Sequence, residues 1–379
     1  MKIWRFLEEE IKKKLLNFPR KIITIYGPRQ VGKTTLAQEV LQKINKKTLS
    51  INADEIKYID VLSSRDSKKM SRLVSDFEVL FIDEAQRIPD VGINLKILFD
   101  QFPNLKIITT GSSSFELANK IKEPLTGRVW TYKLYPIALL ELKKDQTDFA
   151  IKEQLEERMI FGSYPEIFSL KNDQDKRKFL EEISDSYLYK DVLELVSIKN
   201  PSKLRDLLKL LSFQIGNEVS MNELALSLGL AKETVMRYID LLEKSFVVFR
   251  FSSFSKNLRK EVRKKDKIYF YDLGIRNIVI DNLKGINDRF DKGQIWENYL
   301  VSERKKYLNY LNLGASSYFW RIHTGAEIDY LEELDGKIKA FEFKWNKNKK
   351  VKPPKTFLET YPQSEFKVIN SSNFEDFLF

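Results

Sequence analysis

The chain has 379 residues, 42% of them hydrophobic and 31% charged, which is the composition of a folded globular protein with room for about two to four domains. It has no cysteine and one histidine, which excludes disulfides, cysteine-ligated zinc and cysteine catalysis, and argues against a Ser-His triad. No apolar run approaches the roughly 18 residues of a membrane span, so we expect no membrane partner and a cytoplasmic location. The net charge of +11 suits a nucleic-acid partner, although a lysine-rich composition alone would give the same sign.

Residues 27–35 read GPRQVGKTT and fit the phosphate-binding pattern G-x-x-x-x-G-K-[ST]. The short apolar run 21–26 precedes them, as expected of a buried parallel strand. Residues 35–44 follow with helical spacing of their apolar side chains. Strand, loop and helix in this order predict a P-loop that binds ATP together with Mg²⁺.

Each residue type in this loop has a physical role. Gly27 and Gly32 allow the backbone to bend and bring its N–H groups against phosphate oxygens. Lys33 is placed to reach the β- and γ-phosphates, and the Thr34 hydroxyl to bind Mg²⁺. The expected nucleotide-binding residues are Gly27, Pro28, Arg29, Gln30, Val31, Gly32, Lys33, Thr34 and Thr35.

A second apolar run, residues 79–82, ends in two acids, Asp83 and Glu84. This is the Walker B pattern. We expect Asp83 to hold the Mg²⁺ shell opposite Thr34, and Glu84 to orient and deprotonate the attacking water. The second acid favours a hydrolysing ATPase, in which Lys33 and Glu84 are catalytic.

Residues 105–112 form a third apolar run that ends in hydroxyl side chains. In ATPases with an acidic Walker B pair, the strand between the P-loop and Walker B strands ends in a polar sensor near the γ-phosphate. Thr110 or Ser112 is placed for that role, and we count Ser112 among the nucleotide-binding residues. The alternative is a Ser or Thr that caps the next helix.

Arg128 precedes the predicted strand 129–134. It is a candidate arginine finger, acting on the γ-phosphate in cis or from a neighbouring subunit of a homo-oligomer. A surface or structural arginine is the alternative interpretation.

The combination of GPRQVGKTTL, VLFIDEAQRIP, ITTGSSSFEL and LTGR resembles the AAA-type ATPases of bacteria and archaea that carry a C-terminal domain of unknown function. The later motifs FGSYPEIF, YLYKDVLELV and GAEIDYL resemble the same family. The resemblance covers nearly the whole chain. It implies an architecture more than a biochemical role, because the role of this family is itself poorly defined.

Residues 138–158 are helical and charged, 161–166 form a turn, and 175–196 predict a long amphipathic helix. We interpret this segment as a helical lid or connector. From residue 201 the pattern becomes helix, helix, short glycine turn, helix, followed by two short apolar strands, which predicts a winged helix. In the third helix, residues 231–244, the side chains expected to point outward are Lys232, Thr234, Arg237 and Tyr238.

The strands of this predicted winged helix enclose a basic segment, which is where the charge distribution supports phosphate contact with DNA. The alternative is that the winged helix packs against neighbouring domains and touches no DNA. The basic residues are Lys256, Arg259, Lys260, Arg263, Lys264, Lys265 and Lys267.

The last part of the chain predicts a helix containing Glu297, a strand containing Asp329 and a further strand containing Glu342 and Lys344. Glu342 and Lys344 are two residues apart, so they point to the same face of their strand. The ordered set resembles the PD-(D/E)xK nuclease fold, in which the carboxylates would hold Mg²⁺ and Lys344 would stabilise the phosphate. Such domains are also found as inactive binding modules, so the resemblance leaves cleavage open.

The predicted fold is therefore α/β: a P-loop NTPase parallel sheet, a helical lid, a winged helix and a small α/β restriction-endonuclease-like domain. The expected boundaries are 1–140, 141–200, 201–285 and 286–379. The predicted function is ATP hydrolysis coupled to DNA association, with nuclease activity undecided. The alternative is a slow nucleotide-switched regulator whose C-terminal domains bind DNA or protein without catalysis. A third interpretation is that these domains only mediate assembly.

Overall fold

The computed structural model describes residues 3–111, 124–185, 200–254, 266–323 and 325–379. The chain divides into two compact units, one formed by residues 1–137 with 244–246 and the other by residues 138–243 with 247–379. Each unit is considered by itself below. Among the described residues, no helix is both long and apolar enough to cross a membrane.

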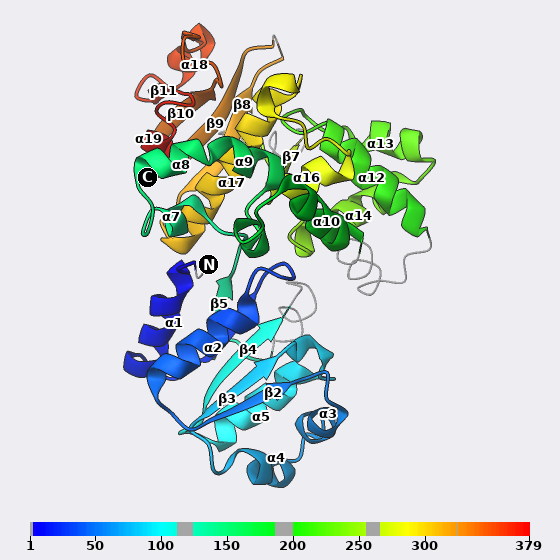
Figure 1. Ribbon diagram of the computed structural model, residues 1–379, viewed down its shortest axis with the longest axis vertical. Coiled ribbons are helices and arrows are strands. Elements are labelled where there is room, and N and C mark those ends of the chain that lie inside the picture. The colour runs from blue at the N-terminus through cyan, green and yellow to red at the C-terminus, as the bar shows by residue number, and fades with distance from the viewer. Residues whose placement is uncertain (1–2, 112–123, 186–199, 255–265, 324) are drawn as a thin grey trace. The chain divides into compact units, whose positions relative to one another are not determined.

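The first unit is built on a parallel sheet of five strands in the order β2-β3-β4-β1-β5 (Figure 1). The interior strands β1, β3 and β4 are buried along almost their whole length, because both faces of a parallel sheet are covered. β4 lies between β1 and β3, which is where the sequence predicts the sensor strand. The strands are β1 (Ile22–Tyr26), β2 (Thr48–Asn52), β3 (Val79–Asp83), β4 (Lys106–Gly111) and β5 (Val129–Lys133).

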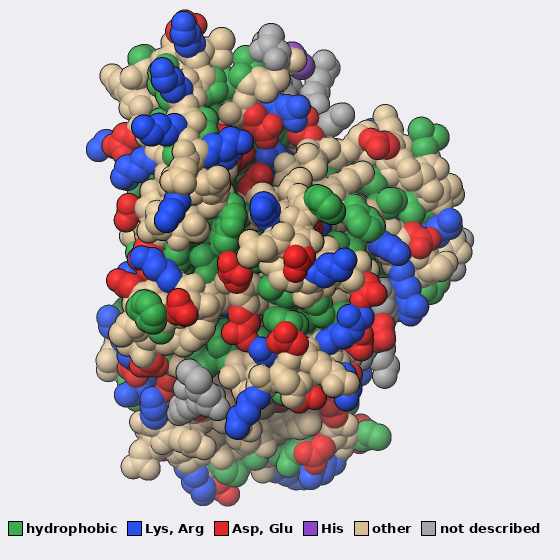
Figure 2. All heavy atoms as spheres, turned by 45° about the horizontal axis from the view of Figure 1, so that its top comes forward, with side chains coloured by type: hydrophobic (Ala, Val, Ile, Leu, Met, Phe, Trp, Pro, Cys, Tyr) green, Lys and Arg blue, Asp and Glu red, His purple; other side chains and the backbone are tan. Residues whose placement is uncertain are grey.

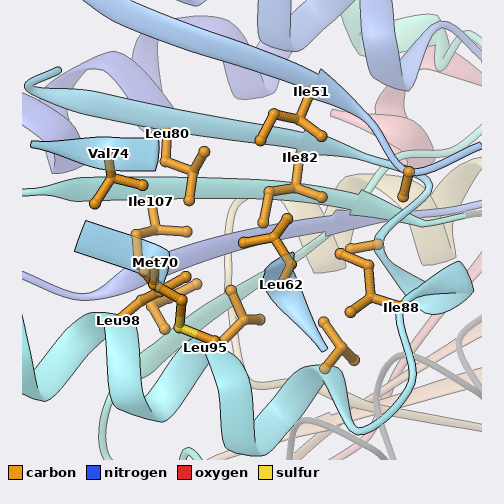
Figure 3. Close-up of a cluster of buried hydrophobic side chains, with 14 of the residues drawn as sticks. Ile51, Leu62, Met70, Val74, Leu80, Ile82, Ile88, Leu95, Leu98 and Ile107 are labelled. Carbon is orange, nitrogen blue, oxygen red and sulfur yellow. The ribbon is translucent and has the colours of Figure 1, made fainter. Parts of the chain in front are cut away.

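Helices cover both faces of this sheet. Side chains of α3 (Ile56–Leu62), α4 (Ser67–Val74) and α5 (Val91–Gln101) form one hydrophobic cluster with β2, β3 and β4 (Figure 3). The other layer contains α2 (Lys33–Ile44), which contacts β4 and contributes no side chain to that cluster, and α1 (Phe6–Asn17), which packs on α2. The predicted strands and helices of residues 21–111 are present with ends shifted by at most about two residues.

The second unit begins with short helices. These are α7 (Leu139–Leu142), α8 (Asp148–Glu153), α9 (Leu155–Phe161) and α10 (Asp173–Ile183). The long helix predicted over 175–196 is seen as α10 in its first part, and residues 186–199 lie outside the described residues.

Three further helices precede an antiparallel pair of strands. They are α12 (Pro201–Phe213), α13 (Met221–Leu228) and α14 (Lys232–Lys244), followed by β6 (Val248–Phe251) and β7 (Lys267–Phe270). Glu218, between α12 and α13, forms a bridge to Lys267 of β7. The Ser220 side chain accepts a hydrogen bond from the Glu223 N–H and so caps the start of α13.

Two expectations about side chains in this region are wrong. Tyr238 does not point outward; it is buried, because it falls on the same face of α14 as Val235 and Ile239. Lys267 is not an exposed basic residue, because it is the first residue of β7 and its side chain is 1% exposed and paired with acids. The remaining predicted basic residues, within 256–265, lie outside the described residues.

The C-terminal part has a four-stranded sheet in the order β11-β10-β9-β8, with α17 (Lys292–Tyr310) packed against it (Figure 1). β9 is antiparallel to β8 and β10, whereas β11 is parallel to β10. The amide of Asn298 on α17 exchanges hydrogen bonds with both backbone groups of Phe270, which ties this helix to β7. The other elements are α16 (Leu273–Val279), β8 (Ser316–Arg321), β9 (Glu327–Leu334), β10 (Lys337–Phe343), α18 (Lys355–Thr360), β11 (Glu365–Ile369) and α19 (Glu375–Leu378).

Candidate functional site

The P-loop and the Walker B acids meet at the carboxyl edge of the parallel sheet. β1 runs into the loop at Gly27, and β3 ends at Asp83. The Thr34 hydroxyl, on the first turn of α2, donates to the Asp83 carboxylate at 2.9 and 3.0 Å. A hydroxyl beside one carboxylate is the oxygen donor set with which proteins hold the Mg²⁺ of a bound nucleotide, so these two residues fit that ion.

Lys33 is held at the mouth of the loop. Its side chain is 5% exposed, and its ammonium donates to the carbonyls of Gly27 at 3.1 Å and Pro28 at 2.8 Å. A buried ammonium costs free energy unless it is paired, so these carbonyls keep the charge in the loop. The positive charge is therefore already positioned where phosphate oxygens enter a P-loop.

The two glycines of the pattern are needed for different reasons. Gly32 has φ +89°, a left-handed conformation that side chains disfavour. At Gly27 the constraint is space, because a Cβ there would lie 2.0 Å from the carbonyl oxygen of Leu134, just past the end of β5. The close approach of β5 to the loop was not visible in the sequence.

Glu84 adopts a strained backbone conformation with φ +53°. Its N–H donates to the Thr110 hydroxyl at 3.3 Å, and its carboxylate accepts a hydrogen bond from the Gln86 amide. Non-glycine residues in this region cost about 1–3 kcal/mol and gather at functional sites.

Thr110, one of the two predicted sensor residues, lies between the Walker B acids. It is fully buried at the end of β4, and its hydroxyl donates to Asp83. It therefore links the sensor strand to both Asp83 and Glu84 within the described residues. Ser112, the other candidate, lies outside the described residues.

Arg128 is not at this site. It immediately precedes β5, whose first residue pairs with Ile22 at the start of β1, so it lies at the amino edge of the sheet. The P-loop follows the other end of β1, roughly 15 Å away at the ordinary rise of a strand. The Arg128 guanidinium instead pairs with Asp100 at 3.1 Å, with both side chains partly exposed. The expectation that Arg128 reaches the γ-phosphate in cis is therefore wrong.

Arg5 is a residue of this site that the sequence did not reveal. It precedes α1, is 6% exposed, and donates to the Val31 carbonyl of the P-loop at 2.7 Å and the Tyr135 carbonyl at 2.6 Å. The guanidinium thus holds the P-loop in place through the Val31 carbonyl. No local pattern marks it, because its partners are 26 and 130 residues away.

Comparison with known families agrees with this geometry. Residues 19–143 match the family model of an AAA domain. The N-terminal part of this chain is therefore similar to AAA-type P-loop domains. Residues 152–287 and 292–376 match two families described as domains of unknown function, DUF8612 and DUF4143.

Similar whole proteins are known in bacteria and archaea. The chain is 28% identical over 330 residues to the uncharacterized protein Rv2008c of Mycobacterium tuberculosis, covering 85% of this chain and 70% of that protein. It is 26% identical to the uncharacterized protein MJ1637 of Methanocaldococcus jannaschii, covering 79% and 72%. The structure of a Walker-type ATPase of Pyrococcus abyssi is similar with a TM-score of 0.49 and 19% identity, covering 72% of this chain and 94% of that one.

The second unit brings the predicted nuclease-like residues to one place. Glu297 of α17, Asp329 of β9 and Lys344 after β10 line a cavity of about 870 Å³, which we call the C-terminal pocket. Glu342 is joined to the set through a 2.6 Å hydrogen bond from the Lys344 ammonium. The pocket is lined by Gly216, Asn217, Lys267, Lys292, Gly293, Gln294, Glu297, Glu327, Asp329, Phe343, Lys344, Trp345, Asn346, Lys347, Lys349 and Ser371.

The acids of the pocket are mostly buried, and burial shifts their pKa values. Burial raises the pKa of Glu297 to about 7, although Lys267 and the Tyr269 hydroxyl act to lower it. Burial also raises the pKa of Asp329 and of Glu342, and the neighbouring Asp329 charge adds to the effect at Glu342. Burial lowers the pKa of Lys267, but the surrounding carboxylates outweigh it and keep that pKa above its ordinary value.

The acids do not converge on a metal site. Glu297 accepts a hydrogen bond from Lys267 at 2.8 Å and another from Tyr269. Asp329 accepts from the Phe343 N–H at 2.7 Å. No group of three or more His, Asp or Glu side chains in the described ranges could hold a metal ion. The expected Mg²⁺ site of Glu297, Asp329 and Glu342 is therefore not found among the described residues, and one oxygen of each carboxylate instead accepts from a lysine, from the Tyr269 hydroxyl or from a backbone N–H.

Proposed function

We propose that this protein binds and hydrolyses ATP, and that its nucleotide state is coupled to DNA association by the C-terminal unit. The observation that carries ATP hydrolysis is the arrangement of Glu84 beside the Thr34–Asp83 pair, with Lys33 held at the mouth of the same loop. An acid next to a Mg²⁺-binding carboxylate is what a hydrolysing P-loop ATPase needs to orient water.

Each residue has a defined task in this proposal. The N–H groups of residues 27–35 cradle the phosphates, and Lys33 neutralises charge on the β- and γ-phosphates. Thr34 and Asp83 would hold Mg²⁺, which supplies charge neutralisation and orients the phosphates. Glu84 accepts the proton of the attacking water, and Thr110 keeps Asp83 and Glu84 in register at the end of the sensor strand.

The proposed coupling to DNA is supported by the second unit. The order of α12, α13 and α14 followed by β6 and β7, with the Glu218–Lys267 bridge, supports the proposal of a winged helix. Lys232 and Arg237 of α14 are exposed and suited to contact phosphate. The contrasting proposal keeps the nucleotide site but makes the protein a slow switch, with C-terminal modules that bind DNA or protein without catalysis. The loss of the carboxylate metal site favours the non-catalytic version of those modules.

An ATPase assay with a DNA titration tests the proposal. Glu84→Gln should retain nucleotide binding but lower turnover by about 100-fold or more, whereas Lys33→Ala should lose binding. DNA should stimulate the wild-type rate, and the stimulation should be absent in Glu84→Gln. Turnover that is unaffected by Glu84→Gln would contradict the assignment of the site, and slow turnover without a DNA effect would support the switch.

Arg128 remains a candidate finger only from a neighbouring subunit of a homo-oligomer. Its partial exposure at the amino edge of the sheet leaves it accessible to another copy. A mixture of Glu84→Gln and Arg128→Ala subunits distinguishes the two roles. Recovery of turnover in the mixture would support action in trans, and no recovery would make Arg128 a surface residue paired with Asp100.

A further inference from the structure

The interior of the C-terminal pocket is neutralised by two lysines. The Lys267 ammonium lies 2.8 Å from Glu297 and 2.5 Å from Glu327, and its side chain is 1% exposed. On the other side, the Lys344 ammonium lies 2.6 Å from Glu342 and 3.7 Å from Asp329. Each of these cations lies between two carboxylates, which is the position that a divalent cation takes in a carboxylate site.

Removing a buried cation from such an arrangement leaves the acids uncompensated, which costs several kcal/mol. Lys267 is fixed from two directions, because it starts β7 while its partners come from α17 and β9. A metal ion would have to displace a strand-anchored lysine from two ion pairs. The residues present therefore do not fit the Mg²⁺ that the nuclease-like fold implies.

The rim of the same pocket has a different charge. Lys292, Lys347 and Lys349 line it, are exposed, and make no ion pair with any described residue. In total the lining contains five lysines against three carboxylic acids. Because the interior lysines are taken up by the acids, the uncompensated positive charge lies at the rim, where a polyanion can approach.

The pocket also offers an aromatic surface and neutral polar groups. Trp345 lies on its wall and is held by an edge-to-face contact with the buried Trp296, at a ring separation of 5.2 Å. Asn217, Asn346 and Ser371 add hydrogen-bonding groups. Proteins commonly bind single-stranded nucleic acid with two kinds of group. Lysines contact the phosphates of the strand, and a nearby aromatic ring stacks on a base. The cavity is large enough for such a group, since ligand sites commonly measure about 300–1,000 Å³.

We propose that the C-terminal pocket binds a single strand of nucleic acid without a divalent cation and without cleaving it. Lys347 and Lys349 contact phosphates, Trp345 stacks on a base, and Lys267 supplies inside the pocket the charge that a metal ion supplies in a nuclease. This inference gives the DNA association proposed above a specific site and rests on that part of the proposed function. It does not depend on ATP hydrolysis.

Fluorescence anisotropy of a labelled 20-nucleotide oligonucleotide tests the inference, using the full chain with Glu84→Gln and no nucleotide. The dissociation constant should agree within about threefold between EDTA and Mg²⁺ at matched ionic strength. Lys347→Glu with Lys349→Glu should weaken binding by at least about tenfold and reduce the salt slope by about 1.4, since single strands contribute about 0.7 per phosphate contact. Trp345→Leu should weaken binding by about tenfold through lost stacking.

The matched control is Lys337→Glu with Lys339→Glu. Both lysines are exposed at the far end of β10 and line no part of the pocket, so this charge reversal should change affinity by less than about threefold. If the two double variants lost the same affinity, the effect would be one of net charge alone, and the proposed site would be wrong. Unchanged binding in the Lys347/Lys349 variant would also overturn it and leave a protein partner as the occupant of the pocket.

Incubation with labelled DNA and Mg²⁺ or Mn²⁺ tests the absence of cleavage. The wild type and Glu342→Ala should leave the same background of intact strand. Cleavage that disappears in Glu342→Ala, or binding that needs Mg²⁺, would overturn the metal-free assignment. Failure of the ATPase assay would leave these results untouched, so the two proposals can fail separately.

Discussion

Glu84 is one of two non-glycine residues of the nucleotide site with a left-handed backbone, the other being Gln30 of the P-loop. The φ of Glu84 is +53°, a value that glycine adopts readily but that is unfavourable for a residue with a side chain. Glu84 directly follows Asp83, the residue whose carboxylate pairs with Thr34. Strain of this kind is retained when surrounding contacts over-determine it. Here the contacts are its N–H to Thr110 and its carboxylate to Gln86.

In the second unit, Asp291 pairs with two buried arginines. Asp291 receives two hydrogen bonds from Arg289, at 2.8 and 2.9 Å, and one from Arg276 at 2.5 Å. Burial raises the pKa of Asp291, but the two arginines outweigh it and lower the pKa to about 2. Both guanidiniums are nearly fully buried, so the carboxylate compensates charges that have no access to bulk water.

This arrangement predicts a pH-dependent stability. An acid with a lowered pKa stabilises the fold above its unfolded pKa of about 3.9 and loses that contribution as the pH falls through the folded value. Asp291→Asn should therefore lower the free energy of unfolding of the second unit by about 2 kcal/mol or more at pH 7. The difference from wild type should narrow as the pH falls from about 4 to 2.

Urea unfolding at a series of pH values measures this effect. Asp288→Asn is the control, because Asp288 is exposed and three residues away. If Asp291→Asn lowered the free energy of unfolding by the same amount at every pH, the loss would come from packing and not from the ionised carboxylate.

At the scale of elements, α1 is connected to the nucleotide site through Arg5, the residue that precedes it. Arg5 connects the start of this helix to the P-loop carbonyl of Val31 and to Tyr135 after β5. Removing the guanidinium takes a donor from each of two carbonyls and loosens the loop that must present its N–H groups to phosphate. The element that covers the sheet thus also fixes the conformation of the loop.

Arg5→Ala should raise the Michaelis constant for ATP by about tenfold or more while changing the maximal rate less, because the loop positions the phosphates and Glu84 is untouched. Arg5→Lys should restore part of the affinity, since one ammonium can reach one of the two carbonyls.

Arg20→Ala is the matched control for this variant. Arg20 is also a partly buried cation that donates to two carbonyls, those of Leu105 and Phe99, but it precedes β1 at the amino edge of the sheet. It should cost stability and leave the Michaelis constant unchanged. If both variants altered ATP affinity equally, Arg5 would have only a structural role.

At the scale of the whole molecule, the two compact units provide separate sites. The residues of the nucleotide site belong to the first unit, and those of the C-terminal pocket, within residues 216–371, belong to the second. Figure 2 shows Lys and Arg side chains interspersed with Asp and Glu on the face in view. The net charge of +11 is therefore not gathered into one basic field on that face, and nucleic-acid binding has to be argued from local groups.

Two units with their own cores should unfold in separate calorimetric transitions. ATP with Mg²⁺ at about 100 times its dissociation constant should raise the stability of the first unit by about 2.7 kcal/mol and shift only one transition. Lys33→Ala should abolish the shift. A single transition that moves as a whole with nucleotide would show instead that the units unfold cooperatively.

The sequence by itself predicted the parallel sheet, the position of β4 between β1 and β3, and the AAA-type nucleotide site. These features depend on local patterns, since a P-loop needs its glycines, lysine and threonine at fixed spacing after a buried strand. The resemblance to the nuclease fold also implied that Glu297, Asp329, Glu342 and Lys344 belong to one site, and alternation along a strand accounts for the pair Glu342 and Lys344.

Only the tertiary structure decided which charges meet. It placed Arg128 at the edge of the sheet opposite the P-loop, brought Arg5 to the loop, and buried Lys267 between Glu297 and Glu327. The physical reason is that ion pairs and buried donors join residues tens to more than a hundred positions apart, whereas sequence patterns report neighbours along the chain. The carboxylates could be located from the sequence, but their partners, lysines in place of a metal ion, could not.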